Sequence, residues 1–215
     1  MTPAGNSRSG FPEFTEIERK FLPAHAGWRT LPATRLHIRQ GYLSLDPERT
    51  VRVRLCEDCR GSAHLAASPG PPPQHTGNSP GLRSVCAASR PGPPPQHAGN
   101  SPAGQAFLTV KGKRRGAAGA EFDFPIPARE AAALLETLAL RPFVEKIRHR
   151  VELPPHIWEI DEFLGENLGL ILIEVELDDE NTPLLLPDWV GSEVTGDMRY
   201  ANASLVREPF GRIKV

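Results

Sequence analysis

The chain has 215 residues, and its 25 lysines and arginines nearly balance its 26 aspartates and glutamates, so the formal net charge is -1. This balance excludes a global basic field that would attract nucleic acid or anionic lipid, and any anion-binding site must therefore be local. The sequence contains no apolar run long enough to span a bilayer, its polar N-terminus does not resemble a secretory signal, and its three cysteines favour a reducing cytoplasm over a disulfide framework.

The chain begins with a polar segment, residues 1–12, which we expect to be disordered, and a single domain is expected over residues 13–215. Within this domain, short runs alternate between apolar and charged residues, which is the period of a strand with one face toward a core. The predicted strands are residues 15–22, 35–44, 50–55, 107–113, 121–126, 144–153, 157–163 and 170–177.

A duplicated Pro/Gly-rich segment interrupts the series of strands. Residues 69–80 read PGPPPQHTGNSP, and residues 91–102 repeat them with one substitution. These units contain almost no apolar residues to bury, so we expect a disordered insert at about residues 61–104 within a hairpin connection, where added length costs little. A docking site for a proline-binding module is the alternative.

Two helices are predicted among the strands. Residues 128–140 lie between two prolines and are rich in Ala, Leu and Glu, whereas residues 192–206 carry apolar side chains at helical spacing. Many antiparallel strands with few helices indicate a mainly β fold, in which one closed or nearly closed sheet has its helices packed outside.

Six of the predicted strands carry charged side chains two residues apart, so the charges of each strand share a face. The solvated outer face of a β-sandwich would give the same pattern in any single strand. Across the set, however, acid pairs occupy the first and the late strands, and basic pairs occupy the middle ones. The run 170–177 is also nearly all apolar before its acids begin, which is typical of a strand buried on both sides. Partly buried charged faces need each other or a ligand.

The two sets of charges suit a metal ion and a polyanion. Carboxylate oxygens are hard donors that suit Mg²⁺ or Mn²⁺, and the candidates are Glu16, Glu18, Asp161, Glu174 and Glu176. Lysine and arginine neutralise phosphate oxygens through charge-assisted hydrogen bonds, and the candidates are Lys20, Arg52, Arg54, Lys111, Lys146 and Arg148. Carboxylates with a metal ion, and cations around a phosphate chain, are what phosphoryl transfer requires.

We also expect Arg52, Arg54 and Lys111 to repel one another until a polyanion binds. On that expectation, replacing Arg54 by alanine leaves the ligand-free protein equally or more stable.

The segment from Glu16 to Lys20 resembles the Glu-x-Glu-x-Lys signature of the CYTH proteins, also called triphosphate tunnel metalloenzymes. Later segments resemble the same family in order, namely VRVRL (51–55), LTVKG (108–112), VEKIRHRV (144–151), IDEFLGENLGLILIEVEL (160–177) and EVTGDMRYANASL (193–205). The resemblance implies a closed eight-stranded antiparallel β-barrel, or tunnel, with a few helices packed outside and charged side chains inside. It also implies hydrolysis of a triphosphate with Mg²⁺ or Mn²⁺ as cofactor.

The resemblance assigns roles to the charged residues. The five acids named above match the metal ligands, and the six cations match the triphosphate-binding residues, among which Lys20, Arg52, Arg54 and Lys111 are the implied catalytic set. Arg199 matches a further basic residue near the tunnel mouth. Position 119 is glycine where the family commonly has arginine, so we expect fewer contacts from the wall that contains Glu121, and we interpret Asp123 as structural.

The opening EIERKFL and the ending GSEVTGDMRYANASL resemble the compact bacterial members of the family, which implies hydrolysis of inorganic triphosphate to pyrophosphate and phosphate. The alternatives are a thiamine triphosphatase, a class IV adenylate cyclase, or a non-catalytic module that binds polyphosphate or nucleotide. We expect a small-molecule substrate, neither nucleic acid nor membrane as partner, and a monomer or homodimer. Trp28, Trp158 and Trp189 are predicted to pack in the core or at its rim.

Overall fold

The computed structural model describes residues 15–59, 104–113 and 117–212. The segment 1–12 and the insert up to residue 103 lie outside this part of the chain, so the predictions made for them are not addressed by the fold. Within the described ranges, no helix is long and apolar enough to cross a membrane.

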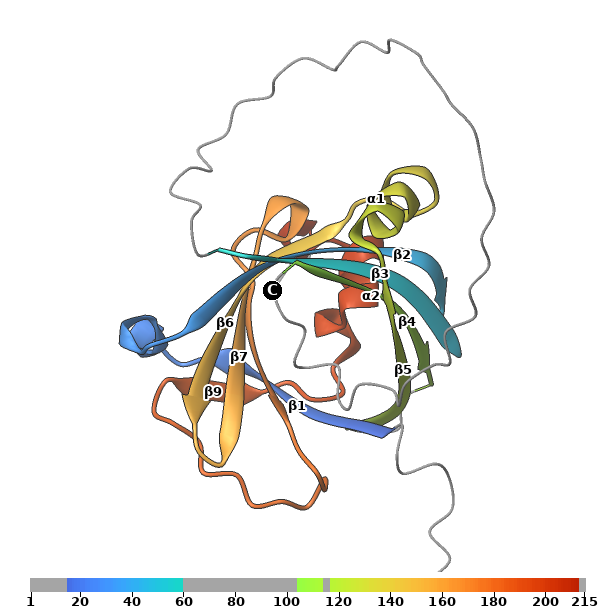
Figure 1. The fold of residues 1–215 in the computed structure, drawn as a ribbon. Helices are drawn as coiled ribbons and strands as arrows, with labels where there is room; N and C mark the ends of the chain where they lie inside the picture. The colour runs from blue at the N-terminus through green and yellow to red at the C-terminus, as the bar shows by residue number, and fades with distance from the viewer. Residues whose placement is uncertain (1–14, 60–103, 114–116, 213–215) are drawn as a thin grey trace, which may run out of the picture.

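The alternating runs form the strands of one antiparallel sheet. These are β1 (Thr15–Pro23), β2 (Thr34–Asp46), β3 (Arg49–Asp58), β4 (Gln105–Gly112), β5 (Ala118–Ile126), β6 (Val144–Leu153), β7 (His156–Phe163) and β8 (Ile171–Glu176). Their order is β5-β4-β3-β2-β6-β7-β8-β1, and β1 also pairs with β5, with Thr15 opposite Ala120. The sheet therefore closes into the predicted eight-stranded barrel, and Figure 1 shows the strands as a ring.

The sequence did not predict a ninth strand, β9 (Val190–Glu193), which pairs with β1 on the edge opposite β8. The helix predicted over residues 192–206 is wrong in its first half. A 3-10 turn (Met198–Tyr200) follows β9, and only Asn202–Arg207 are α-helical, as α2. Gly196 has a φ of +79°, which ends any helical path at that point, and the backbone N–H of Val194 donates to the carbonyl of Lys20 at 2.8 Å.

Helix α1 (Ala128–Thr137) covers the outer face of β3 and β4 and ends three residues before the predicted boundary. Its buried residues Ala131 and Leu135 pack against Val53 and Ala106 of these strands. Close packing also reaches β2, because a Cβ at Gly41 would lie 2.7 Å from the Cβ of Ala139. Glycine at position 41 therefore lets the helix end lie directly on the sheet.

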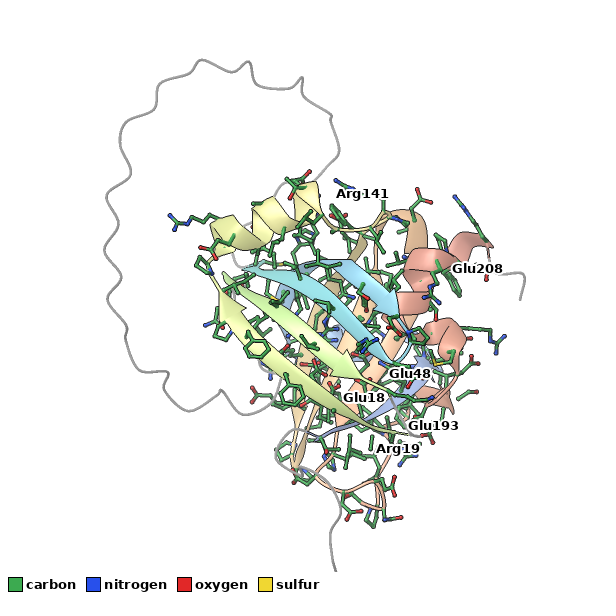
Figure 2. All side chains as sticks on the ribbon, turned by 90° about the vertical axis from the view of Figure 1, so that its right-hand side faces the viewer. Glu18, Arg19, Glu48, Arg141, Glu193 and Glu208 are labelled. Atoms are coloured by element: carbon green, nitrogen blue, oxygen red, sulfur yellow. The ribbon has the colours of Figure 1, made fainter. Side chains whose placement is uncertain are left out.

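The largest apolar cluster lies on the outer side of β1, β6, β7 and β8. Trp28, which belongs to a 3-10 turn (Ala26–Thr30), Trp158 and Trp189 are all nearly fully buried there, together with Phe21. The rings of Trp158 and Trp189 meet edge to face, with centroids 5.6 Å apart. The prediction that the tryptophans pack in the core is confirmed. Outside this cluster, Arg19 of β1 donates to Glu193 of β9 at 2.6 Å, and Figure 2 shows the two side by side.

A second apolar cluster closes one end of the barrel. It joins Leu205 and Val206 of α2 to Tyr42, Val144 and other residues at the ends of β2, β6, β7 and β8. Val144 shares a strand face with Lys146 and Arg148, and Tyr42 lies opposite Arg52 of β3, so both point to the inner face. Figures 1 and 2 show α2 over the opening of the ring and at one end of the strands. Helix α2 therefore closes the barrel interior at this end.

Candidate functional site

The interior of the barrel holds a narrow cavity of about 40 Å³ that is lined almost entirely by charged groups. Its lining residues are Glu16, Glu18, Lys20, Gln40, Arg52, Arg54, Lys111, Lys146, Arg148, Glu159, Glu174, Glu176 and Asn202. All six cations predicted from the sequence and four of the five predicted acids are among them. The charged faces therefore point inward, and the alternative interpretation as outer faces of a β-sandwich is wrong.

Strand register explains why residues far apart in sequence meet. Directly paired residues of antiparallel strands point to the same side of a sheet. Lys20 of β1 lies opposite Glu174 of β8, and Glu174 in turn lies opposite Glu159 of β7. A charged residue at every second position of several neighbouring strands thus becomes a continuous charged wall once the sheet closes.

Arg148 of β6 is the centre of one ion-pair network. Its guanidinium donates to both oxygens of Asp161, at 2.7 and 2.8 Å, to Glu174 at 2.6 Å, and also to Glu159. Burial alone would raise the pKa of Glu174, but Lys20, Lys146 and Arg148 outweigh it and hold that pKa well below its ordinary value. Glu174 is therefore a carboxylate at neutral pH.

A second network occupies the opposite wall, where β3, β4, β5 and the start of β1 meet. Arg52 contacts Glu121 at 3.1 Å, and Lys111 contacts Glu121 at 2.5 Å and Glu16 at 2.9 Å. Burial opposes ionisation of Glu121, but Lys111, together with Arg52, lowers its pKa to about 2. Glu121 therefore neutralises two cavity cations from the wall that has glycine at position 119.

The expectation of mutually repelling cations needs correction. Arg54 donates to Asp123 at 3.2 Å, and Asp123 also accepts a hydrogen bond from Thr109. Together with the pairs of Arg52 and Lys111, this contact gives each of the three cations a carboxylate partner. The sequence could not show these pairings, because they depend on which strands become neighbours in the closed barrel.

Two predicted site residues lie away from the cavity lining. Asp161 is fully buried beneath it, bonded to Lys146 and Arg148, so it holds these two cations in place. Arg199 lies on the 3-10 turn before α2, where its largely exposed guanidinium donates to Asp197 at 2.7 Å. Its predicted contact with the substrate at the tunnel mouth stays a prediction.

Three lining residues were missing from the predicted site. Glu159 shares a strand face with Asp161, and this signal was sufficient to include it. Gln40 and Asn202 are neutral amides, so no charge pattern marked them. Gln40 lies opposite Arg54 on β3 and Val144 on β6, and Asn202 is the first residue of α2.

Glu176 differs from the other acids of the cavity. Its side chain makes no hydrogen bond or ion pair with any residue in the described ranges. Burial, reinforced by repulsion from Glu159, Glu16 and Glu18, raises its pKa from 4.5 to about 8. A carboxyl group with this surplus of negative neighbours would be stabilised by a cation, and oxygen-only donors suit a hard divalent ion.

The acids of the cavity do not form a ready-made metal site in this structure. Within the described ranges, no three acidic, histidine or cysteine side chains are arranged as ligands of one metal ion. Lys20 engages both Glu18, at 3.1 Å, and Glu174. The donor set therefore fits a divalent ion in its chemistry, and Lys20 holds two of these acids in this structure.

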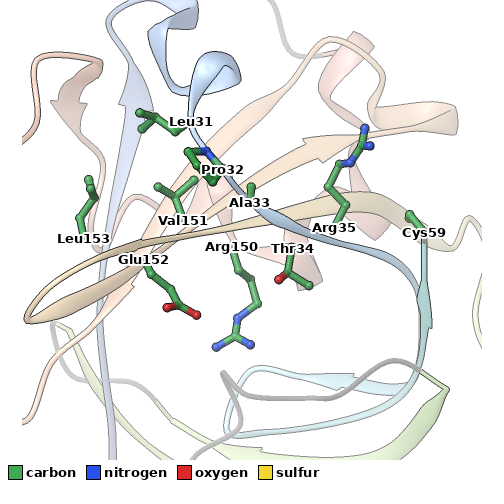
Figure 3. Close-up of a pocket in the computed structure, with 10 residues that line it drawn as sticks. All are labelled: Leu31, Pro32, Ala33, Thr34, Arg35, Cys59, Arg150, Val151, Glu152 and Leu153. Carbon is green, nitrogen blue, oxygen red and sulfur yellow. The ribbon is translucent and has the colours of Figure 1, made fainter.

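A larger cavity, of about 580 Å³, lies where β2 begins and β6 ends, and Figure 3 shows its lining. Leu31, Pro32, Ala33, Val151 and Leu153 make much of that lining apolar. Arg150, which also lines this cavity, forms an ion pair with Glu159 at 3.2 Å. This cavity lacks the concentration of facing acids and bases, so we assign the chemistry to the smaller one.

Comparisons with known proteins agree with this geometry. No family model matches the sequence. An inorganic triphosphatase from Acetivibrio thermocellus is 34% identical over 199 residues, which cover 93% of this chain and 97% of that protein. One from Nitrosomonas europaea is 29% identical over 197 residues, covering 89% of this chain and 96% of the relative. The fold is similar to a crystal structure of an inorganic triphosphatase, with a TM-score of 0.51 and 26% identity, over 89% of this chain and 93% of that one.

Proposed function

The chain belongs to the CYTH, or triphosphate tunnel, family of inorganic triphosphatases, and from this premise we propose that it hydrolyses inorganic triphosphate to pyrophosphate and phosphate. The observation that carries the proposal is the ring of six cations around one cavity inside the barrel. A linear triphosphate offers several negative charges along a short chain, and cations on opposite walls can contact it simultaneously.

The protein's own part in the reaction is to bind and orient the phosphate chain. Lys20 lies on β1, Arg52 and Arg54 lie on β3, Lys111 lies on β4, and Lys146 and Arg148 lie on β6. Because these strands surround the cavity, the cations would hold the chain from several sides and stabilise the charge that develops on the leaving pyrophosphate. The acids beneath them keep the side chains in place before the substrate arrives.

The acids that border the cavity would hold a divalent ion, for which we propose Mg²⁺ or Mn²⁺. Glu16, Glu18, Glu174 and Glu176 supply oxygen donors from the adjacent strands β1 and β8, and Glu159 adds another from β7. When bound, such an ion neutralises phosphate oxygens and lowers the pKa of a coordinated water. Asp161 is held by Lys146 and Arg148, and its predicted role as a ligand stays a prediction.

The arrangement also accounts for how a polyanion could enter so narrow a space. About 40 Å³ is room for only a few water molecules, because the side chains of the two ion-pair networks fill most of the interior. Substrate and metal ion together carry the charges needed to replace those pairs: the ion takes the acids and the phosphates take the bases. A phosphate chain without the ion would leave the acids facing like charge.

The test is to incubate the purified protein with tripolyphosphate, thiamine triphosphate or ATP, each with Mg²⁺, Mn²⁺ or a chelator. Released phosphate and cyclic AMP are both measured. The proposal expects phosphate from tripolyphosphate at the highest kcat/KM, and none in chelator. Preference for thiamine triphosphate, or formation of cyclic AMP from ATP, would reassign the substrate. Binding of triphosphates without turnover under any metal condition would make the protein a binding module.

A matched pair of variants connects activity to the acids of the cavity. Glu18→Gln keeps the shape of the side chain and removes its charge, and turnover should fall by about a hundredfold or more. Glu152→Gln is the control, because Glu152 lies on β6 outside the charged cavity and borders the larger one. Equal turnover of the two variants at saturating metal ion would contradict the metal assignment.

A further inference from the structure

The cavity has two neutral polar residues in an otherwise charged lining, Gln40 and Asn202. Gln40 is 1% exposed, yet neither its side-chain oxygen nor its side-chain nitrogen has a hydrogen-bond partner in the described part of the chain. The side-chain oxygen of Asn202 is likewise buried without a partner. Buried amide groups are nearly always satisfied in folded proteins, so two that face one cavity indicate a ligand that satisfies them.

Both amides lie at the end of the cavity that α2 closes. Gln40 is two residues before Tyr42 on the same strand face and lies opposite Val144, and both neighbours belong to the apolar cluster that packs on α2. Asn202 begins α2 itself. The amides therefore lie between the charged part of the barrel and the end that α2 closes, beyond which a linear substrate cannot extend.

The position of Gln40 is fixed from outside the barrel. The next residue, Gly41, carries no Cβ, and one placed there would lie 2.7 Å from Ala139 and 2.9 Å from Leu135. This close packing holds β2 against the segment that contains α1. A side chain on such a strand keeps its place as the ion pairs around it rearrange.

We propose that Gln40 and Asn202 bind the terminal phosphoryl group of the substrate, so that the phosphate chain lies end-on with its last phosphate against α2. The inference rests on the proposed triphosphatase function and adds to it a subsite for the free end of the chain. Each amide nitrogen donates to a non-bridging phosphate oxygen, and each amide oxygen accepts from water or from a phosphate hydroxyl. The neighbouring cations, Arg54 and Lys146, supply the charge, and the amides supply the recognition of an unsubstituted end.

The subsite predicts a preference that depends on chain ends. A triphosphate with at least one free terminal phosphate should bind, because that end can reach the amides. A triphosphate esterified at both ends, such as diadenosine triphosphate, would place a sugar against α2. We therefore expect diadenosine triphosphate to compete with tripolyphosphate at least about tenfold more weakly than ATP does, which is the loss of one charge-assisted hydrogen bond.

Variants of the two amides test the same subsite directly. Gln40→Met and Asn202→Ala should each raise KM for tripolyphosphate, or lower its calorimetric affinity, by about tenfold or more. Gln40→Met should leave the melting temperature of the ligand-free protein unchanged or higher, because it removes a buried amide without partners. Gln40→Glu, which brings negative charge to the phosphate, should bind more weakly than Gln40→Met.

Asn167 provides a matched control. It is a fully buried amide whose side-chain nitrogen also has no partner within the described ranges, but its oxygen accepts from the backbone of Phe210 at 2.9 Å and it does not line the cavity. Asn167→Ala should lower the melting temperature and leave KM unchanged. The opposite patterns in the two variants separate a ligand contact from a structural one.

The outcomes distinguish this inference from the proposed function. If the wild-type protein binds and hydrolyses tripolyphosphate but Gln40→Met and Asn202→Ala keep its KM and affinity within about twofold, the amides do not bind the substrate and the inference is overturned. Diadenosine triphosphate that competes as well as ATP does would overturn the end-on arrangement. A wild-type protein that neither binds nor hydrolyses tripolyphosphate would overturn both conclusions. If Gln40→Met fails to fold, the KM and affinity of Asn202→Ala alone decide whether the amides bind the substrate.

Discussion

Two glutamates of β8, only two residues apart on the same strand face, differ in their affinity for a proton because they face different neighbours. Glu174 lies among Lys20, Lys146 and Arg148, which hold its pKa well below the ordinary value although the group is buried. Glu176 is half-buried, but its strongest charged neighbours are Glu159 and Glu16, and its pKa rises to about 8. One strand thus provides an anchored carboxylate for the cations and a carboxyl group that gains from a metal ion.

The raised pKa of Glu176 predicts how stability depends on pH in the metal-free protein. Between pH 4.5 and about 8 the folded chain holds a proton that the unfolded chain has lost, so the free energy of unfolding falls as pH rises through this window. Glu18 and Arg148 also face Glu176, and the positive charge of Arg148 opposes the rise of its pKa. Glu176→Gln should flatten the fall, by up to about 1.4 kcal/mol per pH unit. Urea denaturation in chelator at several pH values measures the free energy of unfolding of both proteins. If it changes with pH in the same way for wild type and Glu176→Gln, the raised pKa is not that of Glu176.

Arg54 leads to a second prediction, and its sign is the reverse of the one expected from the sequence. The Arg54 side chain is 6% exposed and contacts Asp123, whose side chain is 9% exposed. Arg54→Ala leaves this acid buried without its cation and should cost about 3 kcal/mol of folding free energy. The control is the double variant Arg54→Ala with Asp123→Asn, which removes the stranded charge and should recover part of the loss. Chemical denaturation of the ligand-free proteins decides, and a single variant as stable as wild type would restore the repulsion hypothesis.

At the scale of elements, the sequence predicted what depends on local periodicity. Alternation of period two located all eight barrel strands, because the two faces of a strand meet different surroundings. Strand β2 reverses the usual pattern, since Leu36, Ile38 and Tyr42 face the interior. The prediction failed for the first half of residues 192–206, where apolar residues at helical spacing do not form a helix. Val194, Met198, Ala201 and Leu205 fit a helix, but Gly196 turns the chain, and the edge of β1 left free by β5 takes up Val190–Glu193 as β9.

Most of the candidate site was also predictable from local patterns, but its ion pairs and its neutral residues were not. Charge at alternate positions identified the residues that line the cavity, since a strand face is a local property. Which acid pairs with which base depends on strand order, so the partners of Arg54 and Lys111 could not be derived from the sequence. Gln40 carries no charge, and only its burial without a partner reveals it.

The hairpin of β3 and β4 predicts that the insert is dispensable for the barrel. These strands pair continuously from Arg49 opposite Gly112 to Cys56 opposite Gln105, and the N–H of Gly104 donates to the carbonyl of Cys56 at 2.6 Å. The two ends of the connection are therefore already side by side, and closing a shorter loop costs less entropy. Replacing residues 61–103 by a short Gly-Asn-Gly linker should leave melting temperature and turnover nearly unchanged. A large loss of either would show that the segment packs on the barrel.

For the whole molecule, a net charge of -1 conceals a strongly polarised interior. The six cations of the cavity point inward and each is neutralised by a carboxylate, so the barrel holds cations for a polyanion. The pairs that border the cavity would be exchanged for ligand contacts when substrate binds, whereas Asp161 keeps Lys146 and Arg148 in place. Binding should accordingly be cooperative between the metal ion, which takes the acids, and the phosphate chain, which takes the bases.

This coupling predicts how ligands shift thermal stability. Tripolyphosphate with Mg²⁺ or Mn²⁺ should raise the melting temperature far more than pyrophosphate with the same ion, because only the longer chain reaches cations on opposite walls of the cavity. A ligand at a hundred times its Kd stabilises the folded state by about 2.7 kcal/mol. In chelator the shift should shrink, since Glu16, Glu18, Glu174 and Glu176 then oppose the phosphate charge. Differential scanning fluorimetry over a titration of each ligand measures all three cases, with sulfate at equal ionic strength as control. Equal shifts for sulfate and tripolyphosphate would mean that the protein responds to anions in general, and the cavity would lose its assignment as a triphosphate site.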